Sequence, residues 1–238
     1  MLADDEVERI LMVFAHPDDV DFGAAGTVAG WTDAGLDVTY CVVTDGDAGG
    51  FDPAVPRDEI AGIRRREQTA AAKEVGVHDL VFLGYHDGVL EPTLELRRDI
   101  ARVIRQVRPH RVVSPSPERN YQRVFASHPD HLAAGEAALC AVYPDARNPF
   151  TFPELAAEGL EAWSVSEVWL MAGPQPDHVV DITEQFERKL RALQCHESQH
   201  PEPDGLEERM RGWGRMTAER FGLPPERLAE IFQIVPTR

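Results

Sequence analysis

The chain has 238 residues, with 24 basic and 41 acidic side chains and a formal net charge of −17. Its length suits one large α/β domain, and we expect a single domain over residues 1–238. The negative charge argues against nucleic acid and against an anionic membrane surface as partners, because phosphate groups would be repelled.

Nothing in the sequence predicts export or membrane insertion. Segment 1–9 is acidic and lacks an apolar signal core, and no apolar run approaches the ~20 residues of a membrane span. The three cysteines, Cys41, Cys140 and Cys195, are scattered and odd in number, which favours free thiols, buried at positions 41 and 140. We therefore expect a cytoplasmic protein.

Segments typical of strands alternate with segments typical of helices along the chain. We expect strands at 10–15, 38–44, 80–83, 111–114, 165–171 and 178–182, and helices at 22–34, 60–75, 96–107, 132–142, 183–195 and 206–221. The first strand is a continuous apolar run, as in a parallel strand buried on both faces. The alternation predicts an α/β fold, a Rossmann-like three-layer sandwich with a mostly parallel sheet and a helical C-terminal extension.

Two short histidine-aspartate motifs stand beside predicted strand ends. Segment 16–19, His-Pro-Asp-Asp, follows the first strand, and segment 128–131, His-Pro-Asp-His, precedes the helix at 132–142. In an open α/β sheet, ligands bind outside the carboxyl ends of the strands. We therefore expect the two motifs to meet at that edge of the sheet.

The residue types in the motifs are those of a catalytic metal site. Zinc prefers histidine nitrogen, carboxylate oxygen or cysteine sulfur, and a catalytic site leaves one position to water. His16, Asp19 and His131 would supply three such ligands. Asp18 then remains beside the metal, where a carboxylate can accept a proton from water.

The second motif holds two further candidates. His128 lies three residues before His131, so in a first helical turn both point to the same side. It could be a fourth ligand or an unliganded acid. Asp130 or a neighbouring carboxylate could orient one of the imidazoles.

Two other interpretations compete with a metal site. A single His-Pro-Asp is more often a turn or a helix cap. However, Asp18, Asp19 and Asp21 crowd one helix entrance, where the helix dipole offsets only about 0.3–1 kcal/mol per carboxylate. Glycines 23 and 26 open a helix after a strand, but their spacing does not match G-x-G-x-x-G and the aspartates would repel a pyrophosphate. A non-catalytic nucleotide-binding α/β module stays the alternative of another class.

Both motifs, together with Gly23-x-x-Gly26-Thr27, resemble the LmbE/PIG-L family of metal-dependent deacetylases. That family includes N-acetylglucosaminylphosphatidylinositol de-N-acetylases and the deacetylases of mycothiol and bacillithiol biosynthesis. Segments 44–46, 64–67 and 83–88 also fall in the family's order, so the resemblance covers most of the chain. It implies Zn²⁺, or Fe²⁺ or another divalent metal, held by residues 16, 19 and 131.

The resemblance also implies roles for other residues. Asp18 would be the general base, and His128, polarised by Asp130, would protonate the leaving amine or stabilise the oxyanion. Arg64 and Asp87 match positions that hold sugar hydroxyls. Taken by itself, Arg64 could equally be a solvated helix residue in a run of arginines. Asp87 could equally be a turn residue.

Several residues depart from the family pattern or have no assigned role. Many members have Glu after the paired aspartates, where this chain has Val20, and a tyrosine two residues before the second motif, where it has Ala126. Tyr121 lies near that motif in the sequence, but nothing places it in the site. The segment with His196 and His200 is similar to a C-terminal segment of relatives, but its charged surroundings favour a surface or capping histidine.

The expected activity is a zinc-dependent hydrolase that removes an N-acetyl group from an N-acetylglucosamine-type conjugate or a related small amide. An amidase acting on a larger thiol-sugar conjugate or an antibiotic intermediate stays open on the same centre. The expected partner is thus a small N-acetylated molecule. Relatives of this length are often oligomers, so a homo-oligomer is one outcome that the resemblance allows.

Overall fold

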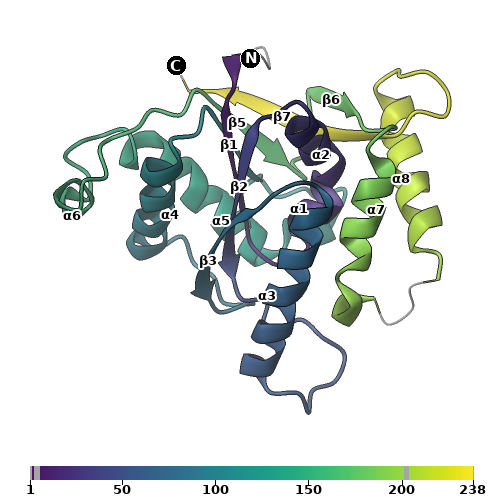
Figure 1. The fold of residues 1–238 in the computed structure, drawn as a ribbon, viewed down its shortest axis with the longest axis horizontal. Helices are drawn as coiled ribbons and strands as arrows, with labels where there is room; N and C mark the ends of the chain where they lie inside the picture. The colour runs from purple at the N-terminus through teal and green to yellow at the C-terminus, as the bar shows by residue number, and fades with distance from the viewer. Residues whose placement is uncertain (1, 3–5, 201–203, 238) are drawn as a thin grey trace.

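The computed structural model describes residues 2, 6–200 and 204–237. Within them, a seven-stranded sheet has the order β3-β2-β1-β4-β5-β7-β6 (Figure 1). Its strands are β1 (Arg9–Phe14), β2 (Asp37–Thr44), β3 (Asp79–Tyr85), β4 (Arg111–Pro115), β5 (Glu167–Met171), β6 (His178–Asp181) and β7 (Ala229–Pro236). The first five strands pair in parallel, whereas β7 is antiparallel to β5 and β6. The expected α/β fold with a mostly parallel sheet is confirmed.

The strand order places a switch point between β1 and β4. The chain builds outward from β1 through β2 to β3, and then returns to place β4 on the other side of β1. Every residue from Ile10 to Ala15 is fully buried, as the apolar run in the sequence predicts. In doubly wound sheets, the crevice beside such a reversal is where ligands bind.

Helices cover both faces of this sheet (Figure 1). On one face lie α1 (Asp19–Gly23), α2 (Ala25–Asp33), α3 (Arg57–Glu74) and α7 (Phe186–Gln194), and on the other α4 (Leu94–Val107) and α5 (Pro129–Cys140). Leu11 and Val13 belong to the core on the α4–α5 face, whereas Ile10, Met12 and Phe14 belong to the opposite core. This alternation is the period of two that a strand imposes.

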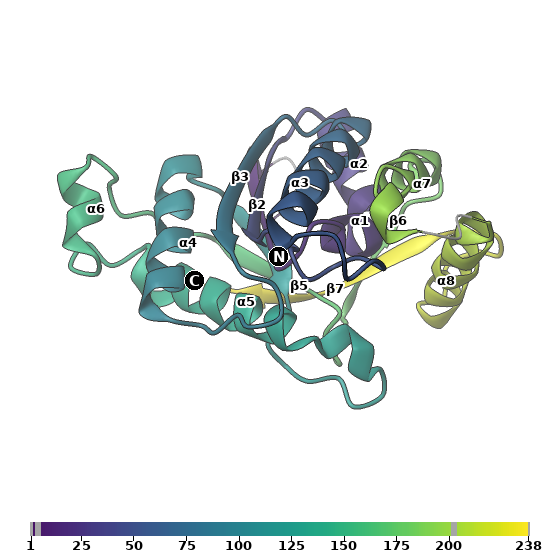
Figure 2. The ribbon, with the colours of Figure 1, turned by 90° about the horizontal axis from the view of Figure 1, so that it is seen from below.

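The remaining elements lie at the periphery. Helices α6 (Pro153–Ala157) and α8 (Leu206–Arg220) lie at opposite ends of the molecule (Figures 1 and 2). Three short turns complete the described chain: the 3-10 helices η2 (Val124–Ser127) and η4 (Glu197–Gln199) and the π-helical turn η3 (Ala141–Asp145). No helix within the described ranges has the length and apolar character needed to cross a membrane.

Some local expectations need correction. The helix expected at 22–34 is divided at Ala24, whose backbone leaves the helical region, and so forms α1 and α2. After the expected helices α7 and α8 the chain returns as β7, a strand that the sequence did not indicate because Glu230 and Gln233 interrupt its apolar pattern. Cys41 is buried as expected, but Cys140 is partly exposed; the three cysteines are free thiols.

Candidate active site

The two histidine-aspartate motifs meet at the carboxyl edge of the sheet, as expected. Segment 16–19 follows β1, and β1 pairs with β4 through Met12 and Val113. The second motif begins α5, which packs closely against the end of β4: a Cβ added at Gly135 would lie 2.4 Å from the Pro115 carbonyl oxygen. This close approach brings the first turn of α5 to the end of β1.

Three of the predicted metal ligands lie together. His131 Nε2 is 3.3 Å from His16 Nδ1 and 2.9 Å from Asp19 Oδ1, and His16 Nδ1 is 3.5 Å from Asp19 Oδ2. One ligand atom of each residue lies within 4.8 Å of the others. Two imidazoles and one carboxylate are the donor set of a catalytic zinc site, so these residues fit a divalent ion.

The outer contacts of these ligands fit the same assignment. His131 Nδ1 lies 3.4 Å from the Ala126 carbonyl oxygen, to which it can donate, and that tautomer leaves Nε2 free to bind a metal. Burial by itself would lower the pKa of His16, but the charge of Asp19 and contacts with Asp130 and Asp87 raise it to about 12. The surrounding carboxylates therefore stabilise positive charge at this point.

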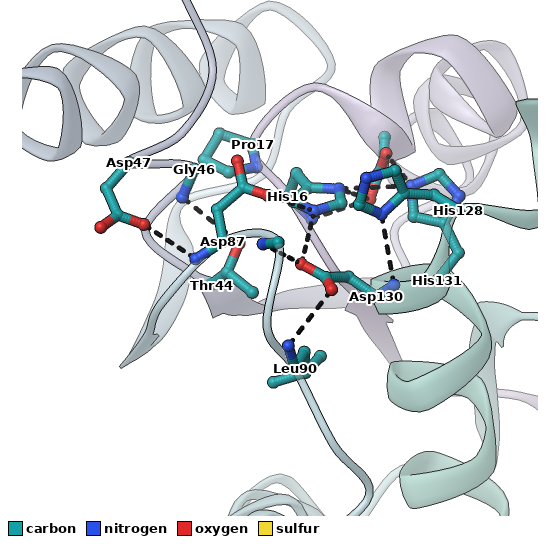
Figure 3. A network of polar contacts seen from close by, with 12 residues as sticks. His16, Pro17, Thr44, Gly46, Asp47, Asp87, Leu90, His128, Asp130 and His131 are labelled. Carbon is teal, nitrogen blue, oxygen red and sulfur yellow. Dashed lines mark hydrogen bonds and ion pairs between the residues drawn. The ribbon is translucent and has the colours of Figure 1, made fainter. Parts of the chain in front are cut away.

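Asp130 orients His16, and its carboxylate is not directed at His128. It accepts hydrogen bonds from the amides of Gly88 (2.7 Å) and Leu90 (3.2 Å), and lies 3.1 Å from His16 Nε2 (Figure 3). Burial would raise the pKa of Asp130, but these hydrogen bonds lower it to about 2. The loop amides hold the carboxylate on the His16 side, and the role of Asp130 toward His128 stays a prediction.

His128 faces the cluster from its exposed side. The Asp130 amide donates to His128 Nδ1 at 3.2 Å, so the neutral ring carries its proton on Nε2. The ring centroids of His128 and His16 are 4.9 Å apart. Burial, followed by the charge of His16, lowers the pKa of His128. The geometry suits a hydrogen-bond donor beside the metal ligands.

Asp87 also contacts His16, which sequence reasoning did not anticipate. Its Oδ1 atom lies 3.1 Å from His16 Nε2, and together with His128 the two residues form a second group with ligand atoms within 4.8 Å of one another. Asp87 is thus part of the cluster and does more than form a turn.

Asp18 stands beside the ligands in a strained backbone conformation. Its φ is +98°, in the left-handed region that non-glycine residues rarely adopt. Its carboxylate lies 3.0 Å from Arg64 Nη2, and the same guanidinium group donates to the Pro17 carbonyl oxygen. Burial raises the pKa of Asp18 to about 7, although Arg64 opposes the shift. A carboxyl group with such a pKa suits proton exchange near neutral pH.

Arg64 is not a solvated helix residue. It is 3% exposed, because the loop after β2 lies against it: a Cβ at Gly49 would lie 2.1 Å from Arg64 Nη1. Its guanidinium group contacts Asp18 and Pro17, and the sugar-hydroxyl contact that the resemblance implied stays a prediction. The arginine run in the sequence hid this, because only one of its members turns inward.

Sequence reasoning missed Asp47. It lies in the loop after β2, is 3% exposed, and accepts hydrogen bonds from the Asp87 amide (2.8 Å), from Arg57 Nε (2.8 Å) and from His86 Nδ1 (2.9 Å). Figure 3 shows this carboxylate on the outer side of the Asp87 turn. The sequence did contain a signal for Asp47, because it is an acidic residue that follows a strand at the ligand-binding edge of the sheet.

A cavity opens next to this turn. Its volume is about 480 Å³, and it is lined by Asp45, Asp47, Arg57, Asp58, Ala61, His86 and Val89. The cavity is open to solvent, and charged side chains such as Asp45 and Arg57 stand among its lining residues. His86 and Val89, which lie on either side of the turn that carries Asp87, belong to this lining.

The histidines and the tyrosine without an assigned role are placed as follows. His196 is fully buried, with Nε2 2.8 Å from Asp21 Oδ2, so the surface or capping prediction is wrong. The chain turns inward after α7, which carries this ring beneath α1. His200 is partly buried against Phe22, and Tyr121 is 86% exposed.

Comparisons with known proteins agree with this site. Residues 11–142 match the family model PIG-L, described as GlcNAc-PI de-N-acetylase. The chain is 38% identical over 197 residues to diacetylchitobiose deacetylase of Thermococcus kodakarensis, covering 83% of this chain and 72% of that protein. It is 34% identical over 199 residues to a probable N-acetyl-alpha-D-glucosaminyl L-malate deacetylase 2 of Bacillus anthracis, covering 80% and 81%.

Solved structures share the fold of this chain. N,N'-diacetylchitobiose deacetylase from Pyrococcus horikoshii superposes with a TM-score of 0.89 at 32% identity, covering 98% of this chain and 85% of that one. GalB, a 4-carboxy-2-hydroxymuconate hydratase from Pseudomonas putida, shares the fold with a TM-score of 0.79 at 22% identity. The family match and the identities above show that this chain belongs to the PIG-L family of de-N-acetylases.

Proposed function

We propose that the chain hydrolyses the N-acetyl group of an N-acetylglucosamine-type conjugate, using Zn²⁺ or another divalent ion such as Fe²⁺. The observation that carries this proposal is the meeting of His16, Asp19 and His131 around one point, with Asp18 beside them. The relatives named above act on diacetylchitobiose and on N-acetylglucosaminyl malate. A divalent ion bound here would polarise a carbonyl group and lower the pKa of water.

The residues of the chain would divide the remaining work. Asp18 would accept a proton from the attacking water, and the Arg64 guanidinium would hold the carboxylate in place. His128 would donate its Nε2 proton to the oxyanion or to the departing amine nitrogen. The products are acetate and a free primary amine.

Substrate recognition is proposed for the turn around Asp87. One oxygen of this carboxylate contacts His16, which leaves the other free to accept a sugar hydroxyl. The adjoining cavity of about 480 Å³ has room for the part of the conjugate beyond the reacting sugar. Charged side chains in its lining, such as Arg57 and Asp58, would offer hydrogen-bonding partners to sugar hydroxyls.

The test is the release of primary amine by zinc-loaded protein. The panel should hold N-acetylglucosamine, N,N'-diacetylchitobiose, N-acetylglucosaminyl malate and an N-acetylglucosaminyl inositol. We expect amine and acetate in equal amounts from at least one of them, and none after chelation of the metal. A fully metallated protein that releases amine from none of these sugars would contradict the proposal.

A further inference from the structure

The strained backbone of Asp18 is held by a buried side chain from α3. The Asp18 amide donates a hydrogen bond of 2.7 Å to Gln68 Oε1, and Gln68 is fully buried. A non-glycine residue at φ +98° keeps that conformation only if its surroundings enforce it. The Gln68 oxygen is therefore part of what fixes the position of Asp18.

The orientation of the Gln68 amide depends on Asp21. Gln68 Nε2 donates to Asp21 Oδ2 at 2.9 Å. An ionised carboxylate only accepts hydrogen bonds, so the NH₂ group of Gln68 must face Asp21. Its oxygen then necessarily faces the Asp18 amide. If the side-chain amide turned over, both hydrogen bonds would be lost.

Asp21 is held in turn by His196. His196 Nε2 lies 2.8 Å from the same Oδ2 atom, and both residues are fully buried. The turn that carries His196 is fixed to α3, because Ser198 donates to both carboxylate oxygens of Glu67, through its amide at 2.8 Å and its hydroxyl at 2.7 Å. A chain of hydrogen bonds thus runs from the segment after α7 to the backbone of Asp18.

Folding stability by itself does not explain why Asp21 and His196 are buried together. Among the described residues, Asp21 Oδ1 and His196 Nδ1 are buried without a hydrogen-bond partner. Apolar side chains of similar size would often stabilise such a position equally well or better. The buried Asp21–His196 pair has unpartnered atoms, and Gln68 links it to the strained backbone of Asp18. These features point to a role in positioning Asp18.

We propose that His196 is a positioning residue: through Asp21 and Gln68 it holds the Asp18 amide, and hence the Asp18 carboxylate, in the orientation needed to accept a proton. This inference rests on the proposed role of Asp18 as the base. Within the described residues, the His196 ring is hydrogen-bonded to Asp21 and not to residues 16, 19 or 131. Its contribution should therefore appear in kcat and leave KM and metal content unchanged.

The variants His196→Leu and His196→Gln test this directly. Leucine removes the donor to Asp21, whereas glutamine can place its Nε2 near that of histidine. We expect kcat to fall about 10- to 100-fold for His196→Leu, as for a small displacement of a catalytic group, and to recover largely in His196→Gln. The matched control is Glu197→Ala, at an exposed position next to His196 and outside this chain of hydrogen bonds, which should keep kcat within about twofold of wild type.

A double-mutant cycle with Asp18→Asn separates positioning from general support. If His196 acts through Asp18, His196→Leu will lower kcat in the wild type but not further in Asp18→Asn. Equal losses in both backgrounds, or an unchanged kcat in folded and zinc-loaded His196→Leu, would overturn the inference. Wild-type kcat in Asp18→Asn would instead overturn the role of Asp18 itself.

A failure of His196→Leu to fold does not end the test. His196→Asn places its amide near the Nδ1 position, away from Asp21, whereas His196→Gln places it near Nε2. Both are polar, so their comparison keeps the burial of a polar group constant. The inference requires a higher kcat for glutamine than for asparagine at equal zinc content, and equal values would contradict it.

Discussion

The Nδ1 atom of His16 lies 3.3 Å from the Nε2 atom of His131, although 115 positions separate the two residues in the chain. Parallel pairing of β1 with β4 brings them together, because it places both motifs at one edge of the sheet. Two imidazole nitrogens at this distance, facing the Asp19 carboxylate, define the centre of the proposed site.

Asp19 and Asp18 should differ in their effect on metal content. Asp19→Ala removes an oxygen that faces both imidazoles, so the variant should lose most of its bound zinc. Asp18→Asn should keep one ion per chain and lose most of its turnover. Elemental analysis of the purified variants measures this. The opposite pattern would reverse the assignment of ligand and base.

Asp130→Asn should weaken metal binding, because the Asp130 carboxylate orients His16. Loss of such an outer contact typically costs 10–100-fold in metal affinity, and we expect about that change. A competition titration with a chromogenic chelator gives the affinity. If the carboxylate acted on His128 instead, kcat would fall at unchanged zinc affinity.

His128→Ala should retain zinc and lose rate. Loss of one donor to a developing oxyanion typically lowers kcat about 10²–10³-fold, which is the expected range. His128→Gln keeps a hydrogen-bond donor without an acid, so partial recovery would indicate oxyanion binding and no recovery would indicate proton transfer. A zinc-free His128→Ala protein would make this residue a fourth ligand.

Zinc should stabilise the folded chain. At a free concentration of about 100 times its dissociation constant, a ligand that binds only the folded state adds about 2.7 kcal/mol to the free energy of unfolding. Chelator-treated protein titrated with zinc should show this gain in urea denaturation. Asp19→Ala is the control and should gain little. Equal stabilisation of both proteins would place the zinc elsewhere.

Asp47 should contribute to stability in a pH-dependent way. Burial would raise its pKa, but hydrogen bonds from the Asp87 amide, Arg57 and His86 lower it below the ordinary value of 3.8. A carboxylate with a lowered pKa stabilises the fold above its unfolded-state pKa, and this contribution disappears as the pH falls through the folded-state pKa. Asp47→Asn should therefore be less stable than wild type near neutral pH and should lose less stability below about pH 4.

Urea denaturation at pH 7 and at acidic pH measures this difference. The matched control is Asp45→Asn, in the same loop, whose carboxylate pairs with the exposed Arg65 side chain at 3.2 Å. Exposed pairs of this kind contribute about 0–1 kcal/mol, so the control should follow the wild-type pH dependence. Parallel pH profiles for wild type and Asp47→Asn would contradict the prediction.

The local pattern of the sequence determined the alternation of strands and helices, the buried β1 run and the identity of the metal-ligand candidates. Apolar periodicity and short motifs depend on residues that are near one another in the chain, so they can be recognised without knowledge of the tertiary contacts. Strand β7 escaped prediction because Glu230 is buried by contacts that come from elsewhere: the Thr27 amide at 2.8 Å and Lys189 Nζ at 2.5 Å. A sequence pattern cannot show that a carboxylate has such partners.

Only the tertiary structure decided which side chains face one another. It turned Arg64 inward onto Asp18, directed Asp130 at His16 and buried His196 against Asp21. Each of these pairs joins segments at least 46 positions apart. Side-chain direction over such separations is set by how helices pack on the sheet and by which loop amides lie opposite each carboxylate. Those are relationships in space that spacing along the chain does not contain.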